Sequence, residues 1–239
     1  NDSIGGMTGT LKGTATVEDG QLYLDGSDGG LALLSDYAMP PAGSATVVAW
    51  FRTSSTVGKS SRVFDFGSGT LSYLSFTPMT DSGGTARFAF KAGEDVEAAV
   101  TYTPTLNDDR DHMVAAVIDE TPTETGANGT MSLYIDGAFV SSSDLNGSTT
   151  LAALDSGPQN YFGKSQWVNT GDLPYRGFID EVRVYNTALT EQAIAALVPD
   201  PNPAAAPAID TQPKDTVADL GGTASLVVGV TGSKPLTYR

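Results

Sequence analysis

The stretch from Met131 to Ser141, MSLYIDGAFVS, is typical of a β-hairpin. Two runs of strand-forming residues, Met131–Ile135 and Ala138–Ser141, flank the pair Asp136-Gly137. Asp-Gly and Asn-Gly pairs supply the positive φ angles that a tight hairpin turn needs. Further pairs of this kind punctuate the first two hundred residues, among them Asp19-Gly20, Asp25-Gly26, Asn128-Gly129 and Asn146-Gly147. Many short strands at this spacing predict a β-sandwich or a barrel.

Short runs with strand composition lie between these turns. They are Gln21–Asp25, Ala45–Arg52, Arg62–Phe66, Ala86–Lys91, Met113–Asp119 and Gly177–Tyr185. A single helix is predicted at Thr190–Leu197, where Thr190 is a natural N-cap and Pro199 stops the helix. The predicted fold class is therefore all-β over residues 1–198: two antiparallel sheets packed face to face, one short C-terminal helix, and Trp50 in the core.

The end of the chain has a different composition. Residues 199–207 contain four prolines in nine positions, which predicts a semi-rigid linker. Residues 208–239 show two or three strands around Gly221-Gly222. These 32 residues are too few to bury a sandwich core, so we expect a partial domain. Because the chain starts at Asn1 without Met, we expect it to be a mature or excised piece of a longer protein.

Charge and cysteine content exclude several classes of function. The 239 residues carry a formal net charge of -15, and such a surface repels nucleic acid and anionic membranes. The absence of cysteine excludes disulfides and Cys-based zinc sites. No stretch has the length of apolar sequence that crosses a bilayer, so membrane insertion is not expected. Divalent cations and neutral glycans are compatible with this surface.

The order of several segments resembles bacterial laminin-G-like, concanavalin-A-like jelly-roll domains of the lectin and glucanase type, over about residues 1–198. The matching segments are Leu22–Gly26, Val47–Phe51, His112–Ala115, Leu133–Gly137, Gly177–Asn186 and Ala188–Glu191. Asp111 departs from the family pattern, which usually has Trp there. The resemblance implies a jelly-roll sandwich that serves as a non-catalytic carbohydrate-binding or adhesion module of a bacterial extracellular multidomain protein.

The tail resembles the start of a bacterial immunoglobulin-like domain. Ile209, Gln212-Pro213, Val217, Gly221 and Pro235–Tyr238 fit its opening strands. The pattern normally continues into a core Trp and further strands, and the chain stops at Arg239 before them. The expected organisation is thus a sandwich at 1–198, a linker at 199–207 and a truncated Ig-like segment at 208–239.

A catalytic constellation is not apparent in the sequence. The single histidine, His112, lies in an apolar strand, which favours a structural role over general-base chemistry. Related sandwich glucanases carry Glu-x-Asp-x-x-Glu on one strand, and that motif is absent. The acidic run Glu94-Asp95-Val96-Glu97 is interpreted as a solvated hairpin. A polysaccharide-cleaving enzyme is therefore the least favoured alternative.

Calcium is a candidate cofactor. Strict alternation along Ile179–Tyr185 puts Asp180 on the same face as Val182 and Val184, an unfavourable place for an unpaired carboxylate. A cation or backbone N–H groups would satisfy it. In the related glucanases the matching strand ligates a structural calcium. The resemblance therefore implies a calcium site with Asp180 as ligand and with Asp25, Gly26 and Asp2 as partners.

Sugars are bound by aromatic faces together with polar side chains. Trp167 lies in a polar, loop-like stretch, Gly163–Asp172, and needs an explanation there. The predicted ligand-binding residues are Trp167, Tyr175, Arg176, Lys164, Gln166, Asn169 and Asp172. Two alternatives stay open: a module that binds a glycan or polysaccharide through this loop, or a structural spacer whose Trp167 covers the sandwich edge or docks on a neighbouring domain of the same chain.

Overall fold

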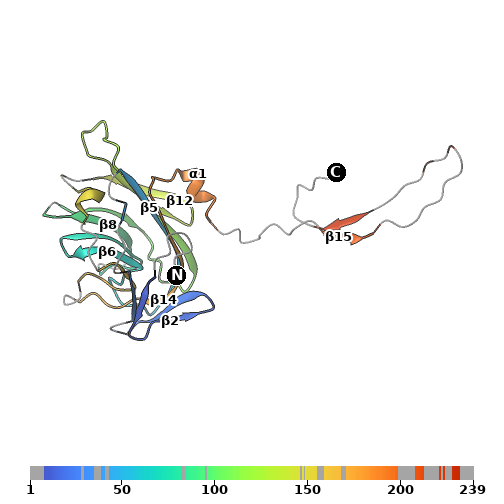
Figure 1. Cartoon of the computed structure of the whole chain (residues 1–239), viewed down its shortest axis with the longest axis horizontal. Helices are drawn as coiled ribbons and strands as arrows, with labels where there is room; N and C mark the ends of the chain where they lie inside the picture. Colours follow the sequence, from blue (N-terminus) through green and yellow to red (C-terminus); the bar gives the residue numbers. More distant parts are fainter. Residues whose placement is uncertain are drawn as a thin grey trace. The chain divides into compact units, whose positions relative to one another are not determined.

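The computed structural model divides the chain into two compact units, Asn1–Val198 and Pro199–Arg239 (Figure 1). The structure describes residues 8–27, 30–34, 39–40, 43–81, 84–94, 96–145, 147, 149–154, 159–167, 171–198, 208–212, 221, 223 and 228–231. Within these residues, no helix has the length and apolarity that crossing a bilayer requires.

The first unit is a sandwich of two seven-stranded antiparallel sheets. Sheet A has the order β1-β4-β13-β6-β7-β8-β9. Its strands are β1 (Thr10–Lys12), β4 (Leu31–Leu33), β13 (Tyr161–Phe162), β6 (Phe64–Gly69), β7 (Ser72–Thr77), β8 (Ala86–Ala92) and β9 (Ala98–Tyr102). Sheet B has the order β12-β11-β10-β5-β14-β3-β2. Its strands are β12 (Ala138–Asp144), β11 (Thr130–Ile135), β10 (Asp111–Asp119), β5 (Ser44–Thr53), β14 (Arg176–Tyr185), β3 (Gln21–Asp25) and β2 (Thr16–Glu18). The all-β, two-sheet prediction is confirmed.

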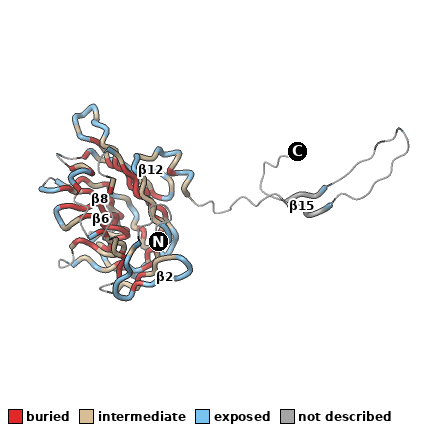
Figure 2. The backbone as a smooth tube through the Cα atoms, viewed as in Figure 1, coloured by how far each residue is buried: buried red, intermediate tan, exposed pale blue. Residues whose placement is uncertain are grey.

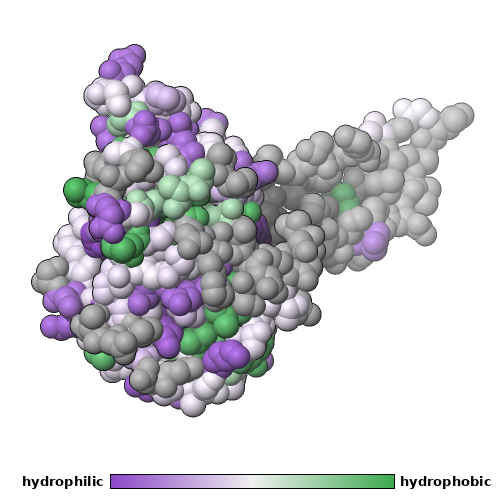
Figure 3. Space-filling model, turned by 60° about the vertical axis from the view of Figure 1, so that its left-hand side comes forward, coloured by the Kyte–Doolittle hydropathy of each residue, from purple (hydrophilic) through white to green (hydrophobic). Residues whose placement is uncertain are grey.

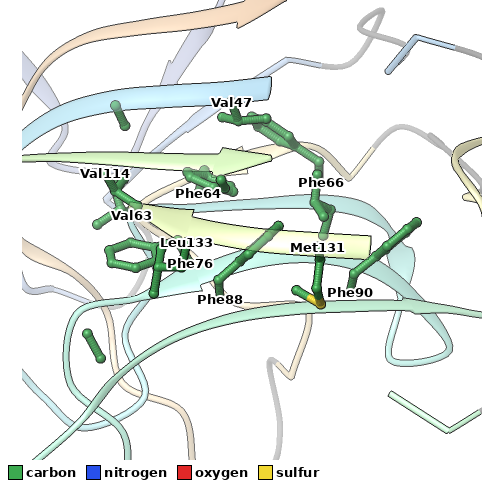
Figure 4. Close-up of a cluster of buried hydrophobic side chains, with 14 of the residues drawn as sticks. Val47, Val63, Phe64, Phe66, Phe76, Phe88, Phe90, Val114, Met131 and Leu133 are labelled. Atoms are coloured by element: carbon green, nitrogen blue, oxygen red, sulfur yellow. The ribbon is translucent and has the colours of Figure 1, made fainter. Parts of the chain in front are cut away.

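The core lies between the two sheets, where Figure 2 shows the buried backbone. Because side chains alternate along a strand, every second residue of a central strand enters it. The phenylalanines of β6, β7 and β8 face the aliphatic residues of β5, β10 and β11 (Figure 4). Each phenylalanine that is fully removed from water contributes roughly 1.5–3 kcal/mol. A single short 3-10 turn, η1 (Leu151–Ala153), closes the connection after β12 within the described residues.

The outer face of sheet B carries a second, smaller core under helix α1 (Glu191–Ala195). Thr190 caps the helix by accepting a hydrogen bond from the Ala193 N–H at 3.3 Å, so the predicted N-cap is confirmed. Ile194 is fully buried against this face, together with Val48 and Met113.

The expectation that Trp50 lies in the sandwich core is wrong. Ala49 and Phe51 of β5 face the interior, so alternation sends Trp50 to the outer face, where it is only partly buried. The Arg183 guanidinium lies 4.9 Å from its ring centroid and covers the indole. Asp111, the residue that departs from the family pattern, forms an ion pair with Arg52 at 2.8 Å.

The second unit contains one described strand pair. β15 (Ala208–Thr211) pairs antiparallel with β16 (Gly229–Thr231). Most of residues 208–239 lie outside the described residues, so the Ig-like assignment and the partial-domain expectation stay predictions.

Candidate functional site

A polar loop crosses the outer face of sheet A. It follows β13 and includes residues 163–167 and 171–175 among those described. The Gln166 N–H donates a hydrogen bond to Asp65 Oδ2 at 3.0 Å, and the rings of Trp167 and Tyr73 form a T-shaped pair with 4.5 Å between centroids. Asp65 of β6 and Tyr73 of β7 point outward because their strand neighbours Phe64, Phe66 and Leu74 point into the core. The loop thus places an indole on the sheet surface.

Arg62 lies at the centre of the site. Its Nη2 atom is 3.0 Å from Asp172 Oδ2, and its Nε atom is 3.7 Å from Asp65 Oδ2. Its guanidinium carbon is 5.6 Å from the centroid of the Trp167 ring. Asp172 also accepts a hydrogen bond from Ser165 Oγ at 2.6 Å. Arg62 therefore joins strand β6, both arms of the loop and the indole into one network.

Asp65 is an unusual carboxyl group. It is 0 % exposed, and its Oδ1 atom has no hydrogen-bond partner among the described residues. Burial raises its pKa to about 7; the Arg62 charge and the Gln166 N–H oppose this shift, and Asp172 adds to it. A buried carboxyl group with a strongly shifted pKa is a frequent feature of functional sites.

The site continues across β7 and β8. The Tyr73 hydroxyl donates to Glu97, which also forms an ion pair with Arg87. Burial raises the pKa of Tyr73 to about 12. On the other side, the Lys164 ammonium is 6.0 Å from the ring centroid of Tyr161, which pairs in register with Asp65. Aromatic and charged groups therefore alternate across four adjacent strands, β13, β6, β7 and β8.

The structure brings together three of the predicted ligand-binding residues: Trp167, Lys164 and Asp172. Gln166 is close to them but buried, since it is only 5 % exposed and its side-chain amide donates to the Gln159 carbonyl at 2.6 Å. Gln166 therefore anchors the loop through its hydrogen bonds instead of contacting a ligand as predicted.

Two other predicted residues, Tyr175 and Arg176, lie elsewhere. Tyr175 is 0 % exposed and its hydroxyl lies 3.1 Å from Thr53 Oγ1. The prediction that Tyr175 contacts the ligand is wrong, because its ring lies in the core and not on the surface. Arg176 is exposed, but it belongs to sheet B and pairs with Asp25. Asn169 lies outside the described residues.

Sequence reasoning missed Arg62, Asp65, Tyr73, Arg87 and Glu97. The segment Arg62–Phe66 contained a signal, because Asp65 interrupts an otherwise apolar strand. A carboxylate inside such a strand needs partners. Its partners come from a loop about a hundred residues later, which the local pattern cannot reveal.

The residues proposed for calcium do not assemble into one site. Asp180 is exposed, because a β-bulge between Ile179 and Glu181 interrupts the alternation and turns Asp180 outward; the expectation that it faces inward beside the valines is wrong. Asp25 pairs with Arg176, four residues before Asp180, a separation of roughly 13 Å along a strand.

One carboxylate oxygen of Asp25 already has two hydrogen-bond donors. Its Oδ1 atom accepts hydrogen bonds from the Ser27 N–H and from Thr14 Oγ1, both at 2.8 Å, and these bonds lower its pKa. Gly26 forms the turn with φ of 80°, and Asp2 lies outside the described residues. The described residues contain no group of three acidic or histidine side chains that could hold a metal ion. Asp180 and Asp25 therefore do not ligate one calcium ion together, and calcium binding elsewhere stays a prediction.

Glycoside hydrolysis needs a carboxylic acid that reaches the glycosidic oxygen. Asp65 has the raised pKa of a general acid, but it is sealed under the backbone of Gln166 and cannot touch a substrate on the sheet surface. Asp172 is committed to Arg62 and Ser165. This arrangement serves to hold the loop rather than to transfer a proton to a sugar.

The only histidine of the chain links two turns. His112 Nδ1 is 2.9 Å from Asp136 Oδ2, and its Nε2 atom is 3.0 Å from Asp108 Oδ1. Asp136 also accepts the Met113 N–H at 2.8 Å and occupies the left-handed region, with φ of 51°, at the hairpin turn. His112 is thus a structural clamp on sheet B.

The His112 clamp gives a prediction about pH. Hydrogen bonds that the protonated imidazole donates to Asp136 and Asp108 raise the pKa of His112 above 6.5, so an NMR titration of its imidazole signal is expected to have its midpoint above that value. The stability that protonated His112 contributes is complete below its pKa in the unfolded chain, and it is lost as pH rises through its pKa in the folded protein. Asp136→Asn is expected to move the midpoint back down, and an unchanged midpoint in this variant would assign the shift to another cause.

The laminin G family model, described as the concanavalin A-like lectin/glucanases superfamily, matches residues 13–195. No curated protein sequence matches the chain.

Solved structures share the sandwich at low identity. The CBM40 domain of the Ruminococcus gnavus IT-sialidase, bound to alpha2,3 sialyllactose, has a TM-score of 0.58 and 15% identity, over 79% of this chain and 98% of that domain. Domain 4 of AbnA, an extracellular GH43 arabinanase from Geobacillus stearothermophilus, in complex with arabinotriose, has a TM-score of 0.61 and 19% identity, over 82% of this chain and 91% of that domain. The binding domain of botulinum neurotoxin serotype D/C has a TM-score of 0.60 and 14% identity, over 87% of this chain and 50% of that chain. At these identities the likeness concerns the fold.

The sequence match and the fold agree. The matched residues cover more than half of the chain and coincide with the two-sheet sandwich of the first unit. The chain belongs to the concanavalin A-like lectin/glucanases superfamily.

Proposed function

We propose that the first unit is a non-catalytic carbohydrate-binding module of an extracellular multidomain protein, and that it holds a glycan across the outer face of sheet A beside Trp167. The observation that carries the proposal is the partly exposed indole, which Arg62 and Tyr73 fix on the surface of a rigid sheet. Two of the structural neighbours are sugar-binding domains in complex with sialyllactose and arabinotriose.

The geometry suits a sugar for a physical reason. A pyranose presents a face of C–H groups that packs on an aromatic ring and a rim of hydroxyls that needs polar partners. Trp167 supplies the ring, and Lys164, Arg87 and Glu97 supply charged groups on the same face. The ion pairs and the sheet hold these side chains before a ligand arrives, which lowers the entropy cost of binding.

The alternative, a spacer that docks on a protein, fits the surface less well. Large exposed hydrophobic side chains in the described residues are scattered over strands and turns. They are Leu11, Val17, Leu71, Val96, Phe139, Leu173 and Val228. On the face in Figure 3, the hydrophobic residues form separate spots among hydrophilic ones. Protein-docking sites usually present a larger continuous apolar patch.

The test is a glycan screen with the parent protein, followed by titration of the strongest glycan against Trp167→Ala. We expect Trp167→Ala to weaken binding at least tenfold, because removal of a central aromatic contact typically costs more than 1 kcal/mol. Trp50→Ala is the matched control: it removes the other tryptophan, from the outer face of sheet B, and is expected to leave the affinity unchanged. Equal affinity of parent and Trp167→Ala, or no glycan bound at all, would favour the spacer.

A further inference from the structure

We propose that the Trp167 site selects acidic sugars, which it binds through an anionic substituent held by Lys91 and Lys164 on either side of the indole. This inference rests on the proposed function and specifies the class of ligand. Neutral and acidic glycans are both compatible with a sandwich of this kind, and the distribution of charge on sheet A distinguishes them.

Basic residues are concentrated on this face of an acidic protein. The whole chain has 13 Lys and Arg against 28 Asp and Glu. Among the described residues that these contacts and strand pairings place around Trp167, four are nevertheless basic, Arg62, Arg87, Lys91 and Lys164, and three are acidic, Asp65, Glu97 and Asp172. The local balance is therefore opposite in sign to that of the molecule. A reversed local charge is typical of a surface that binds a charged partner.

The two arginines and the two lysines have different roles. Arg62 and Arg87 are held in ion pairs with the acidic residues of the site. Lys91 and Lys164 make no ion pair within the part of the chain that the structure describes, and both side chains are partly exposed. An ammonium group that is ordered near a binding surface but not neutralised is suited to an incoming anion.

The positions of the lysines fit a ligand that extends past the indole. Lys91 of β8 pairs in register with Tyr73, the residue that contacts Trp167, so the two side chains share the outer face. Lys164 stands over Tyr161 of β13. Strands β13 and β8 are three places apart in the sheet, roughly 14 Å. Trp167 contacts Tyr73 of β7, a strand between β13 and β8, so we expect a short oligosaccharide stacked on the indole to reach an ammonium at one end or at both.

The buried carboxyl group strengthens this selectivity. Asp65 is one of the two acidic groups beside Arg62, and it lies under the loop rather than on the surface. Burial favours its neutral form, so Asp65 contributes less negative charge to the site as pH falls towards 7 and below. Glu97 is engaged by Arg87 and Tyr73.

The experiment compares matched pairs of sugars by calorimetric titration. The first pair is 3′-sialyllactose and lactose, which differ only by the acidic residue. The second is trigalacturonate and its methyl ester, in which methyl groups replace the negative charges of the carboxylates. A third ligand, 3′-sulfolactose, separates recognition of a sulfate from recognition of a carboxylate. Each sugar is titrated into the parent protein and into Lys91→Gln, Lys164→Gln and Trp167→Ala. Lys12→Gln, an exposed lysine on the edge strand β1, is the charge-matched control.

We expect at least one acidic sugar to bind more tightly than its neutral counterpart. Lys91→Gln or Lys164→Gln is expected to raise its Kd about two- to fivefold, as the loss of one partly exposed ion pair does. Lys12→Gln is expected to bind like the parent. Neutral sugars that bind as tightly as the acidic ones and depend on Trp167 would overturn this inference and leave the proposed function standing. Acidic sugars that bind equally to parent and lysine variants would also overturn it. No binding of any sugar in either pair would overturn both proposals.

Discussion

Replacing Arg62 by Gln is expected to lower the free energy of unfolding by about 3–5 kcal/mol at pH 8. The guanidinium is almost fully buried, and it is the positive charge nearest to both Asp65 and Asp172 among the described residues. Its removal leaves a carboxylate that is 0 % exposed with the Gln166 N–H as its remaining described partner. The cost is therefore mainly that of an uncompensated buried charge. Urea denaturation monitored by fluorescence measures it.

The effect of this substitution is expected to depend on pH. In the folded protein the pKa of Asp65 is about 7, above the ordinary value of 3.8, so the folded state binds this proton more tightly than the unfolded chain. The stability linked to Asp65 is therefore complete below the unfolded pKa and declines as pH rises through the folded one. Without Arg62 the folded pKa moves higher still. The penalty is thus expected to be smaller at pH 5 than at pH 8, with a remainder from Asp172.

Two further variants identify the cause. Arg52→Gln removes the same charge from an exposed ion pair with Asp111, and such pairs are worth about 0–1 kcal/mol. Arg62→Gln combined with Asp65→Asn is expected to regain much of the loss at pH 8, because the neutral amide needs no counter-charge. Equal losses for Arg62→Gln at pH 5 and pH 8 would show that the charge of Asp65 is not the cause.

Gly67→Ala is the second change with a large expected effect, a loss of more than about 3 kcal/mol. A Cβ atom at Gly67 would lie 2.0 Å from the Ser72 carbonyl oxygen and 2.9 Å from Tyr73 Cα, both backbone atoms of the neighbouring strand β7. Strand β7 would have to move away from β6. Because Tyr73 supports Trp167, glycan binding is expected to weaken along with thermal stability.

Gly69 supplies the matched control in the same strand. It also has a positive φ, 143°, but a Cβ atom there meets nothing within 4 Å. Gly69→Ala therefore carries only the conformational strain of a side chain at positive φ, about 1–2 kcal/mol. Thermal melting of both variants separates the steric clash from the strain. Similar losses of thermal stability in Gly67→Ala and Gly69→Ala would contradict a steric clash at Gly67.

The sandwich was predictable because its signals are local. Asp-Gly turns, short alternating strands and the capped helix at Thr190 each depend on residues within a few positions of one another. The ordered family segments added the topology. Alternation failed at Asp180, because the bulge in β14 is set by its pairing with β5 and not by the composition of β14. Trp50 was misplaced because it lies in an apolar strand, and its face depends on which side of sheet B meets the core.

The candidate site was predictable only in part. Trp167 stood out because a tryptophan in a polar loop is unusual, and Lys164 and Asp172 were found by their nearness to it in the sequence. Tyr175, equally near, enters the core. Arg62, Asp65 and Tyr73 were missed because they meet the loop only through tertiary contacts.

The sequence by itself determined the all-β class, the acidic and cysteine-free surface, the capped helix and the polar loop that carries Trp167, since each follows from composition or from neighbours along the chain. The tertiary structure alone decided which face each side chain occupies and which charges meet. It separated Asp180 from Asp25, and it joined Arg62 to Asp172 across 110 residues. The physical reason is that pairing register and loop docking are set by burial and charge compensation between distant segments, which no local pattern encodes.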